Sequence, residues 1–501
     1  MYPGKWAQEF PEKQAVINST TCESISYREL ESKSAQLAHF FRSRGIERGD
    51  HVTLFIKNDI KYFEIAWAAM RSGIYLTPAN SWLKPTELSY IIKNSEAKLL
   101  IVDKALEEVC NKLVVENDPI KLSFNGSLES FDSYEEIVYS YPTDAPDNNP
   151  KGTFMFYSSG TTGQPKGIKW PLLDEQIHED HEHYLFHKEL WFYDQETVAI
   201  VTSPLYHAAP AHMALTAHAF GGTVVMMPKF DAEDALRVIQ EYKVTHGQWV
   251  PTQFMRMHKL PKEVKDSYDV SSQKVITHAA APCPVDLKEE MIEWWGNIFF
   301  EYYSGSEGVG MTHAEPSDWK KYPGTVGKAL MGIIHICDKD GVELPAGEIG
   351  KIYFESEHEF DYHKDPEKRE KSRHFDHSSW SSFGDIGYVN EEGYLFLTDR
   401  ESFMIISGGV NIYPQEVENL LSMHDEIEDV AVIGIPDEDM GESVKAFIKL
   451  SDKALERLDN EAFFIEYTRK NLAHYKCPST IEFVEELPRS DSGKLVKRYL
   501  K

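Results

Sequence analysis

Short apolar runs alternate with amphipathic segments along the first third of the chain, and this alternation constrains the fold more than any other feature. Ser26 and Glu29 form a capping-box pair at the start of a predicted helix, which should end at Gly45. Apolar runs at residues 51–56 and 98–102 alternate with further helical segments. Strands that alternate with helices form parallel sheets covered by helices. We therefore predict an α/β fold.

Later segments of the chain extend and then change this pattern. A second alternating series begins at residue 198, so a second α/β layer is expected. From Gly347 the chain shows short strands separated by turn signals, including a hairpin turn at 390–393, which predicts a small β subdomain. We expect a large N-terminal domain, residues 1–399, that holds two α/β layered subdomains and the small β subdomain. A compact α+β domain, residues 400–501, should follow as a lid.

Bulk composition indicates a globular protein and excludes several classes of function. Hydrophobic residues make up 42% and charged residues 27% of the 501 residues, enough apolar surface for more than one core. The net charge of -29 disfavours a nucleic-acid partner, because phosphate binding needs a basic face. The five cysteines stand singly and no run of about 18 apolar residues occurs, which favours a cytoplasmic protein with reduced thiols, no zinc site and no transmembrane segment.

Residues 156–167, FYSSGTTGQPKG, concentrate glycines and hydroxyl residues ahead of one lysine. Glycines let backbone N–H groups face an anion, while hydroxyls and a lysine add donors and charge. Pro165 stands where the Walker loop needs a glycine before its lysine, so that loop is excluded. A flexible polar linker is the alternative reading. The predicted phosphate ligands are Ser158, Ser159, Gly160, Thr161, Thr162, Gly163 and Lys166.

This loop closely resembles the signature of the adenylate-forming superfamily, which comprises acyl-CoA synthetases, aryl-CoA ligases, luciferases and the adenylation domains of peptide synthetases. Family motifs recur along nearly the whole chain. The resemblance implies that the protein activates a carboxylic acid with ATP and Mg²⁺ to an acyl-AMP, releases pyrophosphate, and then transfers the acyl group to coenzyme A. It also implies a mobile C-terminal lid that rotates between the two half-reactions.

Residues 301–308, EYYSGSEG, resemble the aromatic and acidic motif of the family. The resemblance implies that Tyr303 stacks on adenine and that Glu307 holds Mg²⁺, with Thr161 as a second metal ligand. Without the resemblance, a buried structural glutamate would be the preferred reading of Glu307. The motif departs from the usual Tyr-Gly-x-Thr-Glu by its two serines, and the further residues expected at the nucleotide are Tyr302, Ser304, Gly305 and Ser306.

Two other segments resemble parts of the nucleotide site. Residues 380–385, WSSFGD, resemble W-x-x-T-G-D with Phe383 in place of the threonine, which implies that Asp385 and Arg400 fix the ribose. An exposed turn is the alternative for Asp385. Residues 278–284, HAAAPCP, resemble the segment that follows the adenine edge, where close backbone approach needs small residues. Its expected contacts are Ala280, Ala281 and Pro282.

The motif SPLYHAAP places His207 where acyl-CoA synthetases face the substrate carboxylate. Adenylation domains of peptide synthetases carry an aspartate there to pair with an amino group, so His207 argues against amino acid substrates. Taken alone, a histidine after an apolar strand is more often a core residue. The resemblance puts the acyl pocket between Trp249, Ala279 and Gly332, and its apolar walls favour a fatty or similarly lipophilic acid.

The C-terminal region supplies residues that should act when the lid moves. Lys494 in PRSDSGK matches the mobile lysine of the family, which stabilises developing charge during adenylation; an exposed basic tail is the alternative. Gly408 and Gly409 are expected to line the tunnel for coenzyme A, and Ser402 occupies the hinge position.

Two further patterns in the sequence are discounted. The histidines at 178, 181, 183 and 187 miss the HExxH spacing, and we expect them on a solvated surface segment. The glycines at 305, 308 and 310 form GxxGxG, the reverse of the dinucleotide fingerprint, which argues against NAD.

The sequence therefore predicts an ATP-dependent acyl-CoA synthetase whose partners are a carboxylic acid, ATP and coenzyme A, with a homodimer allowed. Two other functions stay open. One is an enzyme that loads a carrier protein, and the other is a non-catalytic nucleotide sensor on the same fold. The sensor remains an alternative because the sequence departs from the family motifs at Ser304, Phe383 and Ser402.

Overall fold

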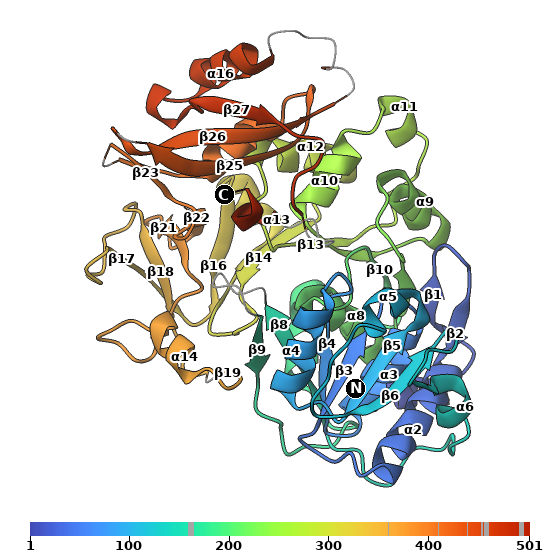
Figure 1. Cartoon of the computed structure of the whole chain (residues 1–501). Helices are drawn as coiled ribbons and strands as arrows, with labels where there is room; N and C mark the ends of the chain where they lie inside the picture. Colours follow the sequence, from blue (N-terminus) through green and yellow to red (C-terminus); the bar gives the residue numbers. More distant parts are fainter. Residues whose placement is uncertain are drawn as a thin grey trace. The chain divides into compact units, whose positions relative to one another are not determined.

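The computed structural model of the protein (Figure 1) describes residues 1–158, 165–358, 360–408, 410–437, 439–451, 454, 460–489 and 495–500. The chain divides into two compact units. The first unit comprises Met1–Gln248, Lys262–Thr277 and Glu359–Glu370, and the second comprises Trp249–Pro261, His278–His358 and Lys371–Lys501. Each unit is described by itself below. In the described part of the chain, no helix is long and apolar enough to cross a membrane.

The first unit contains an eight-stranded sheet made from the alternating N-terminal segments. Its strand order is β19 (Asp361–Tyr362), β9 (Lys166–Lys169), β8 (Thr153–Ser158), β4 (Tyr75–Pro78), β3 (His51–Phe55), β5 (Leu99–Asp103), β6 (Ile120–Phe124) and β7 (Asp132–Ser133). From β8 to β7 all neighbours are parallel, as predicted, whereas β9 and β19 join antiparallel.

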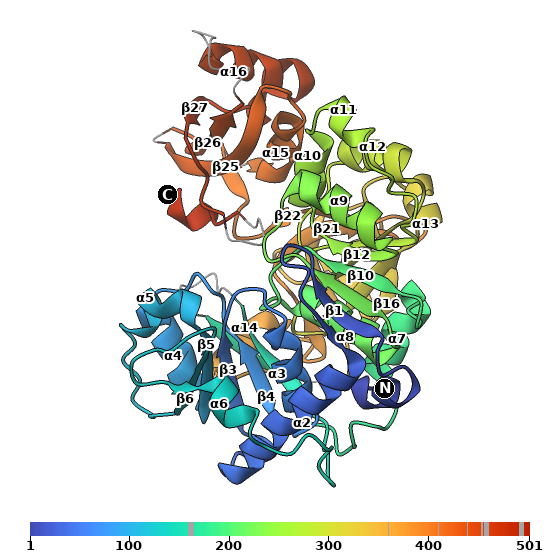
Figure 2. The same cartoon turned by 90° about the vertical axis from the view of Figure 1, so that its right-hand side faces the viewer.

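Helices cover this sheet because its strands are apolar on both faces. They include α2 (Tyr27–Ser43), α3 (Lys61–Met70) and α4 (Pro85–Ser95) (Figure 2). Leu100 and Val102 of β5 share a core cluster with Leu88 and Ile92 of α4, while the alternate residues of β5 are also buried. Helix α2 begins with the expected capping box, in which the Ser26 N–H donates to Glu29 at 2.7 Å. The α/β prediction is therefore confirmed.

A second group of strands, which continues to β13 (Val275–His278) beside β12, completes the first unit. Its order is β12 (His246–Trp249), β10 (Val198–Val201), β11 (Thr223–Met226), β1 (Gln14–Asn18) and β2 (Ser24–Ser26). The neighbours are parallel except for β1 and β2. Three helices accompany these strands: α7 (Glu182–Trp191), α8 (Ala208–Ala219) and α9 (Ala232–Tyr242). The second α/β layer thus forms as the sequence predicts.

The second unit contains two groups of strands. The larger group has the order β17 (Ile333–Cys337), β18 (Gly350–Glu355), β21 (Asp385–Val389), β22 (Leu395–Arg400), β16 (Thr325–Met331), β15 (Met311–Ala314) and β14 (Phe299–Ser304). All these neighbours are antiparallel. The predicted hairpin turn joins β21 to β22, where the Asn390 N–H donates to the Tyr394 carbonyl at 3.0 Å and Gly393 has a φ of 82°. Helices α10 (Pro251–His258) and α12 (Val285–Trp295) also belong to this unit.

The smaller group of strands comes entirely from residues after Arg400. Its order is β24 (Val410–Ile412), β23 (Ile405–Ser407), β26 (Gly441–Leu450) and β25 (Ile427–Asp437), with β27 (Thr480–Phe483) parallel to β26. Helices α15 (Pro414–Ser422) and α16 (Asn460–Asn471) pack here through Val417, Leu421 and Phe464. The predicted α+β fold of this region is therefore confirmed as a small C-terminal sheet, antiparallel except for β27, with helices packed on it.

The histidine-rich segment is not the solvated surface that the sequence predicts. His178 is exposed, but His187 is only 7% exposed. The rings of His183 and His187 are 4.1 Å apart, and His183 lies 4.6 Å from His212 of α8. The prediction was wrong because α7 packs against α8, so one face of α7 with both residues is covered. Across the described residues, no group of three or more His, Cys, Asp or Glu is arranged to hold a metal ion.

These buried histidines should make the first unit sensitive to acid. Burial lowers the pKa of His183 to about 4 and holds the pKa of His187 well below its usual range. Above about pH 6.5 both the folded and unfolded forms are neutral; below it the unfolded chain takes up a proton that the folded chain excludes, so stability falls. We expect His187→Gln to reduce the slope of unfolding free energy against pH by about 1.4 kcal/mol per pH unit between about pH 6 and 5.

The measurement is urea denaturation at a series of pH values. His178→Gln is the matched control, because His178 is exposed on the same segment. The control should keep the slope of the wild type. Equal slopes for His187→Gln and the wild type would contradict the prediction.

Candidate active site

The predicted phosphate-binding loop connects two paired strands of the first unit. β8 and β9 are antiparallel, and Ser158 is the register partner of Lys166. The two ends of the loop are therefore held opposite each other. The Lys166 ammonium lies 5.0 Å from the ring of Tyr362 on β19. The remaining predicted phosphate ligands, Ser159, Gly160, Thr161, Thr162 and Gly163, lie outside the described residues.

His207 caps the N-terminus of α8 in the same unit. It is half-buried, follows the turn after β10, and lies 4.5 Å from the ring of Tyr206. The first turn of a helix carries unpaired N–H groups and a partial positive charge, which favours a carboxylate nearby. The position of His207 thus suits the role that its motif implies.

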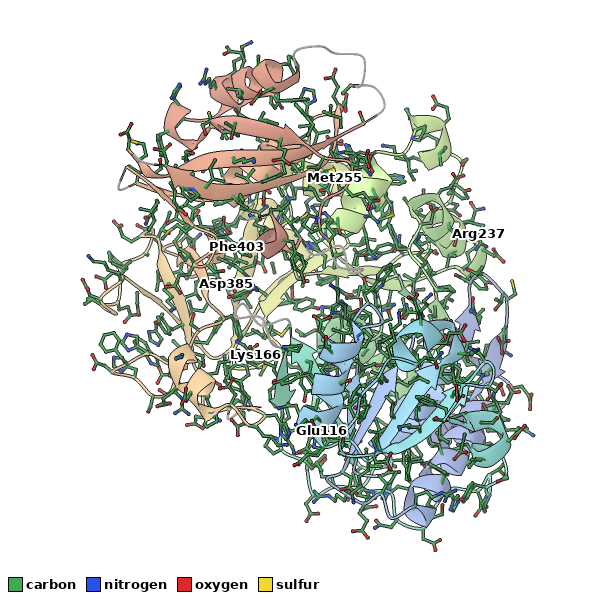
Figure 3. All side chains as sticks on the ribbon, in the orientation of Figure 1. Glu116, Lys166, Arg237, Met255, Asp385 and Phe403 are labelled. Carbon is green, nitrogen blue, oxygen red and sulfur yellow. The ribbon has the colours of Figure 1, made fainter. Side chains whose placement is uncertain are left out.

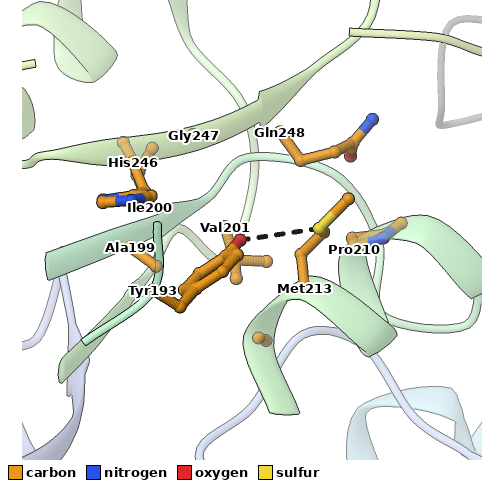
Figure 4. Close-up of a pocket in the computed structure, with 10 residues that line it drawn as sticks. Tyr193, Ala199, Ile200, Val201, Pro210, Met213, His246, Gly247 and Gln248 are labelled. Carbon is orange, nitrogen blue, oxygen red and sulfur yellow. Dashed lines mark hydrogen bonds between the residues drawn. The ribbon is translucent and has the colours of Figure 1, made fainter. Parts of the chain in front are cut away.

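A small enclosed cavity lies beside α8 and was not foreseen from the sequence (Figure 4). Its volume is about 10 Å³, close to the space that one water molecule needs. The Tyr193 hydroxyl donates to the Met213 sulfur at 3.5 Å across it. The lining residues come from α8, β10 and β12 and from Tyr193: Ala199, Ile200, Val201, Pro210, Met213, Ala214, His246, Gly247 and Gln248.

Two residues that line the cavity follow His207 on α8. Pro210 and Ala214 stand three and seven positions after His207, which is the spacing of one helical face. At a rise of about 1.5 Å per residue, Ala214 lies roughly 10 Å along the axis from His207. This spacing is the sequence signal that could have identified the lining residues.

In the second unit, three residues predicted from separate motifs come together. The Tyr303 hydroxyl on β14 donates to Asp385 Oδ2 at 2.7 Å, and Arg400 Nε lies 3.1 Å from Asp385 Oδ1. Asp385 and Arg400 are register partners on β21 and β22 (Asp385 is labelled in Figure 3). Asp385 is 7% exposed, so it is not the exposed turn considered as an alternative. Burial first, and then the Asp385 carboxylate, hold the pKa of Tyr303 well above its usual range.

The expected adenine-edge segment is a turn between β13 (Val275–His278) and α12. Ala279 is buried, Ala280 and Ala281 are exposed, and Pro282 is half-buried. Ala280 has a φ of 73°, in the left-handed region that alanine rarely adopts. The turn therefore presents exposed backbone with little side-chain bulk.

A tight turn after β14 carries Glu307. The Gly308 N–H donates to the Gly305 carbonyl at 3.0 Å, and the Ser304 hydroxyl donates to the Gly310 carbonyl at 2.8 Å. Glu307 is half-buried in this turn and Ser306 is exposed. Burial raises the pKa of Tyr302, which precedes Tyr303 on β14.

One departure from the family motifs, Phe383, packs against the segment at residues 301–308. Phe383 stands in place of the usual threonine, and a Cβ added at Gly305 would lie 2.5 Å from its ring. Phe383 also packs edge-on against Tyr303 at 5.7 Å. The ring of Phe383 thus fills the volume that a side chain at residue 305 would take.

The pair should therefore be coupled energetically. Gly305→Ala alone overpacks the site and should cost about 1–3 kcal/mol of stability. In a Phe383→Ala background the same change should cost at least about 1 kcal/mol less. Urea denaturation of the wild type, both single variants and the double variant measures this coupling. Additive effects would show that the two residues do not share the space.

The remaining predicted residues occupy varied environments in the second unit. Trp249 is fully buried against Trp295, with ring centroids 5.5 Å apart, while Gly332 is exposed and has a φ of 76°. Ser402 is exposed after Arg400, and the Gly408 N–H donates to the Met440 carbonyl at 2.8 Å. Gly409 and Lys494 lie outside the described residues.

Comparison with known families agrees with these motifs. The model of the family described as "AMP-binding enzyme" matches residues 4–360, and that described as "AMP-binding enzyme C-terminal domain" matches residues 416–494. The chain belongs to the AMP-binding enzyme family. Within it, this AMP-binding enzyme is an adenylate-forming acyl- or aryl-CoA ligase that uses ATP and coenzyme A.

Its relatives act on different acids. The chain is 28% identical to the long-chain-fatty-acid–CoA ligase FadD13 of Mycobacterium tuberculosis over 98% of this chain and 95% of that one. It is 29% identical to a feruloyl-CoA synthase of Amycolatopsis, over 99% of this chain and 97% of that protein. Among solved structures, ATP-bound MatB of Rhodopseudomonas palustris superimposes with a TM-score of 0.80 at 26% identity. The match covers 100% of this chain and 98% of that one. The acid that this AMP-binding enzyme activates therefore depends on its own pocket.

Proposed function

We propose that the protein is an acyl-CoA synthetase for a lipophilic carboxylic acid of the fatty type. The observation that supports this acid most is helix α8, on which the buried apolar residues Pro210, Met213 and Ala214 follow His207 and line a small, mainly apolar cavity. A carboxylate held at the N-terminus of α8 would direct its tail along the helix toward Met213. The helix end and His207 favour an anion, and the motif has no acid to pair with an amino group, so amino acids should be poor substrates.

The nucleotide would be held by residues that the second unit brings together. Tyr303 would stack on adenine, the turn at Ala280–Pro282 would follow its edge, and Asp385 with Arg400 would hold the ribose. The Glu307 carboxylate is half-buried on an ordered turn and offers the hard oxygen ligand that Mg²⁺ prefers. Glu307, together with Thr161, would hold Mg²⁺, which when bound neutralises charge on the triphosphate.

The reaction would proceed in two steps. The substrate carboxylate attacks the α-phosphorus of ATP, forming acyl-AMP as pyrophosphate leaves. The sulfur of coenzyme A then attacks the acyl carbon and AMP leaves. Lys494 would stabilise the first step, and a lid of residues 400–501 turning at Ser402 would bring Gly408 and Gly409 to coenzyme A for the second.

The test is acid-dependent exchange between ATP and pyrophosphate, with a panel of acids, followed by thioester formation with coenzyme A. We expect exchange with apolar-tailed acids and thioester formation with free coenzyme A. Exchange without thioester formation would favour the enzyme that loads a carrier protein. Nucleotide binding without exchange would favour the sensor, and exchange with α-amino acids alone would overturn the substrate class.

The cavity also predicts a determinant of chain length. Met213→Ala removes three heavy atoms from the cavity wall and should extend the preferred acid by about two carbons. We expect the ratio of kcat/KM for the longer over the shorter acid to rise about ten-fold. Met227→Ala is the matched control, since Met227 is equally buried in the first unit but does not line the cavity. An unchanged preference in Met213→Ala would place the acyl tail elsewhere.

A further inference from the structure

Three ionisable side chains are buried together in the second unit and have no role in the reaction described above. Lys288 of α12 and His278 at the end of β13 are fully buried, and Glu301 of β14 is 5% exposed. The Lys288 ammonium lies 2.6 Å from Glu301 Oε2. His278 Nε2 lies 3.4 Å from the same oxygen.

The positions of these residues along the chain connect them with the adenine turn. His278 immediately precedes the segment Ala279–Pro282, and Lys288 lies in the first turn of the helix that follows it. Glu301 stands two residues before Tyr303 on β14. One carboxylate oxygen therefore contacts both flanks of the turn and belongs to the strand that carries the stacking tyrosine.

The turn itself has few contacts of its own to define its shape. Ala280 and Ala281 are exposed, and Ala280 adopts the left-handed conformation that alanine disfavours. Such a conformation persists only where the surrounding structure imposes it. The residues on either side of the turn are buried and hold it in place. On one side, the Lys288 ammonium contacts Glu301 and lies 4.6 Å from the ring of Trp319.

Burial and the Lys288 ammonium act in opposite directions on the pKa of Glu301 and in the same direction on the pKa of His278. Burial raises the pKa of Glu301, while the Lys288 ammonium opposes that rise. Burial and the same ammonium keep the pKa of His278 well below its usual range. A buried ion pair is often no more stabilising than an apolar pair of similar size, so its distinct contribution is a fixed geometry.

We propose that Glu301, with Lys288 as its charge partner, is a positioning residue that sets the adenine turn relative to Tyr303 and so determines how well the enzyme recognises adenine. The inference rests on the proposed adenine-binding role of Ala280–Pro282 and Tyr303. Glu301 acts through these residues and does not itself contact the nucleotide.

The test compares ATP with ITP, which carries an oxo group in place of the 6-amino group on the base edge. The variant is Lys288→Met combined with Glu301→Gln, which removes both charges and leaves neither one buried alone. We expect the ratio of kcat/KM for ATP over ITP in acid-dependent exchange to fall at least about ten-fold. The loss should come mainly from a higher KM for ATP, with the KM for the acid unchanged.

This ratio is measured on one preparation with both nucleotides, so it does not depend on the fraction of protein that is folded. A second variant, Glu301→Asp, keeps the charge but withdraws the carboxylate by one methylene group. It should lower the ratio less than the double variant does. Equal ratios in the wild type and both variants would overturn the proposal.

The matched control removes a buried ion pair in the first unit. Arg71 Nη2 and Glu31 Oε1 are 2.7 Å apart, and their side chains are 2% and 16% exposed. Arg71→Met with Glu31→Gln should change stability but leave the ATP over ITP ratio unchanged; an equal fall in this control would overturn the positioning role. Absence of exchange in the wild type would instead refute the proposed function, and this inference with it.

Discussion

The organisation of the candidate nucleotide site depends on the interactions of the Asp385 carboxylate. This carboxylate accepts a hydrogen bond from the Tyr303 hydroxyl and pairs with the Arg400 guanidinium. The three residues stand on three different strands. A buried carboxylate needs such partners, because its loss of water is costly unless charge and hydrogen bonds replace it. The requirement therefore ties β14, β21 and β22 to one geometry at the point where the ribose would lie.

Around this network the protein departs from its relatives' motifs in a compensated way. The ring of Phe383 occupies the space beside Gly305, and it also packs on Tyr303. A larger residue at 305 and a phenylalanine at 383 could not both fit, since close-packed interiors leave no spare volume. The departure at Phe383 is thus accommodated by the glycine at 305, which weakens the argument that Phe383 marks a site without function.

In the first unit, helix α8 combines two properties that an acid-activating enzyme needs. Its N-terminus, where His207 stands, would favour a carboxylate, and Met213 further along the helix lines the small cavity. Further along, His212 contacts the buried histidines of α7. Burial lowers the pKa values of His187 and His212, which favours neutral imidazoles packed inside the unit.

The sequence by itself determined the α/β class, the alternation of strands and helices, and the family, because these depend on local periodicity and on short motifs such as that around Lys166. It could not show that His187 is buried, that Phe383 fits against Gly305, or that Met213 lines a cavity. The sequence also could not show that His278, Lys288 and Glu301, from two strands and a helix, lie in contact. Such contacts arise only when elements distant in sequence pack together, and volume and charge must then be satisfied in three dimensions rather than along the chain.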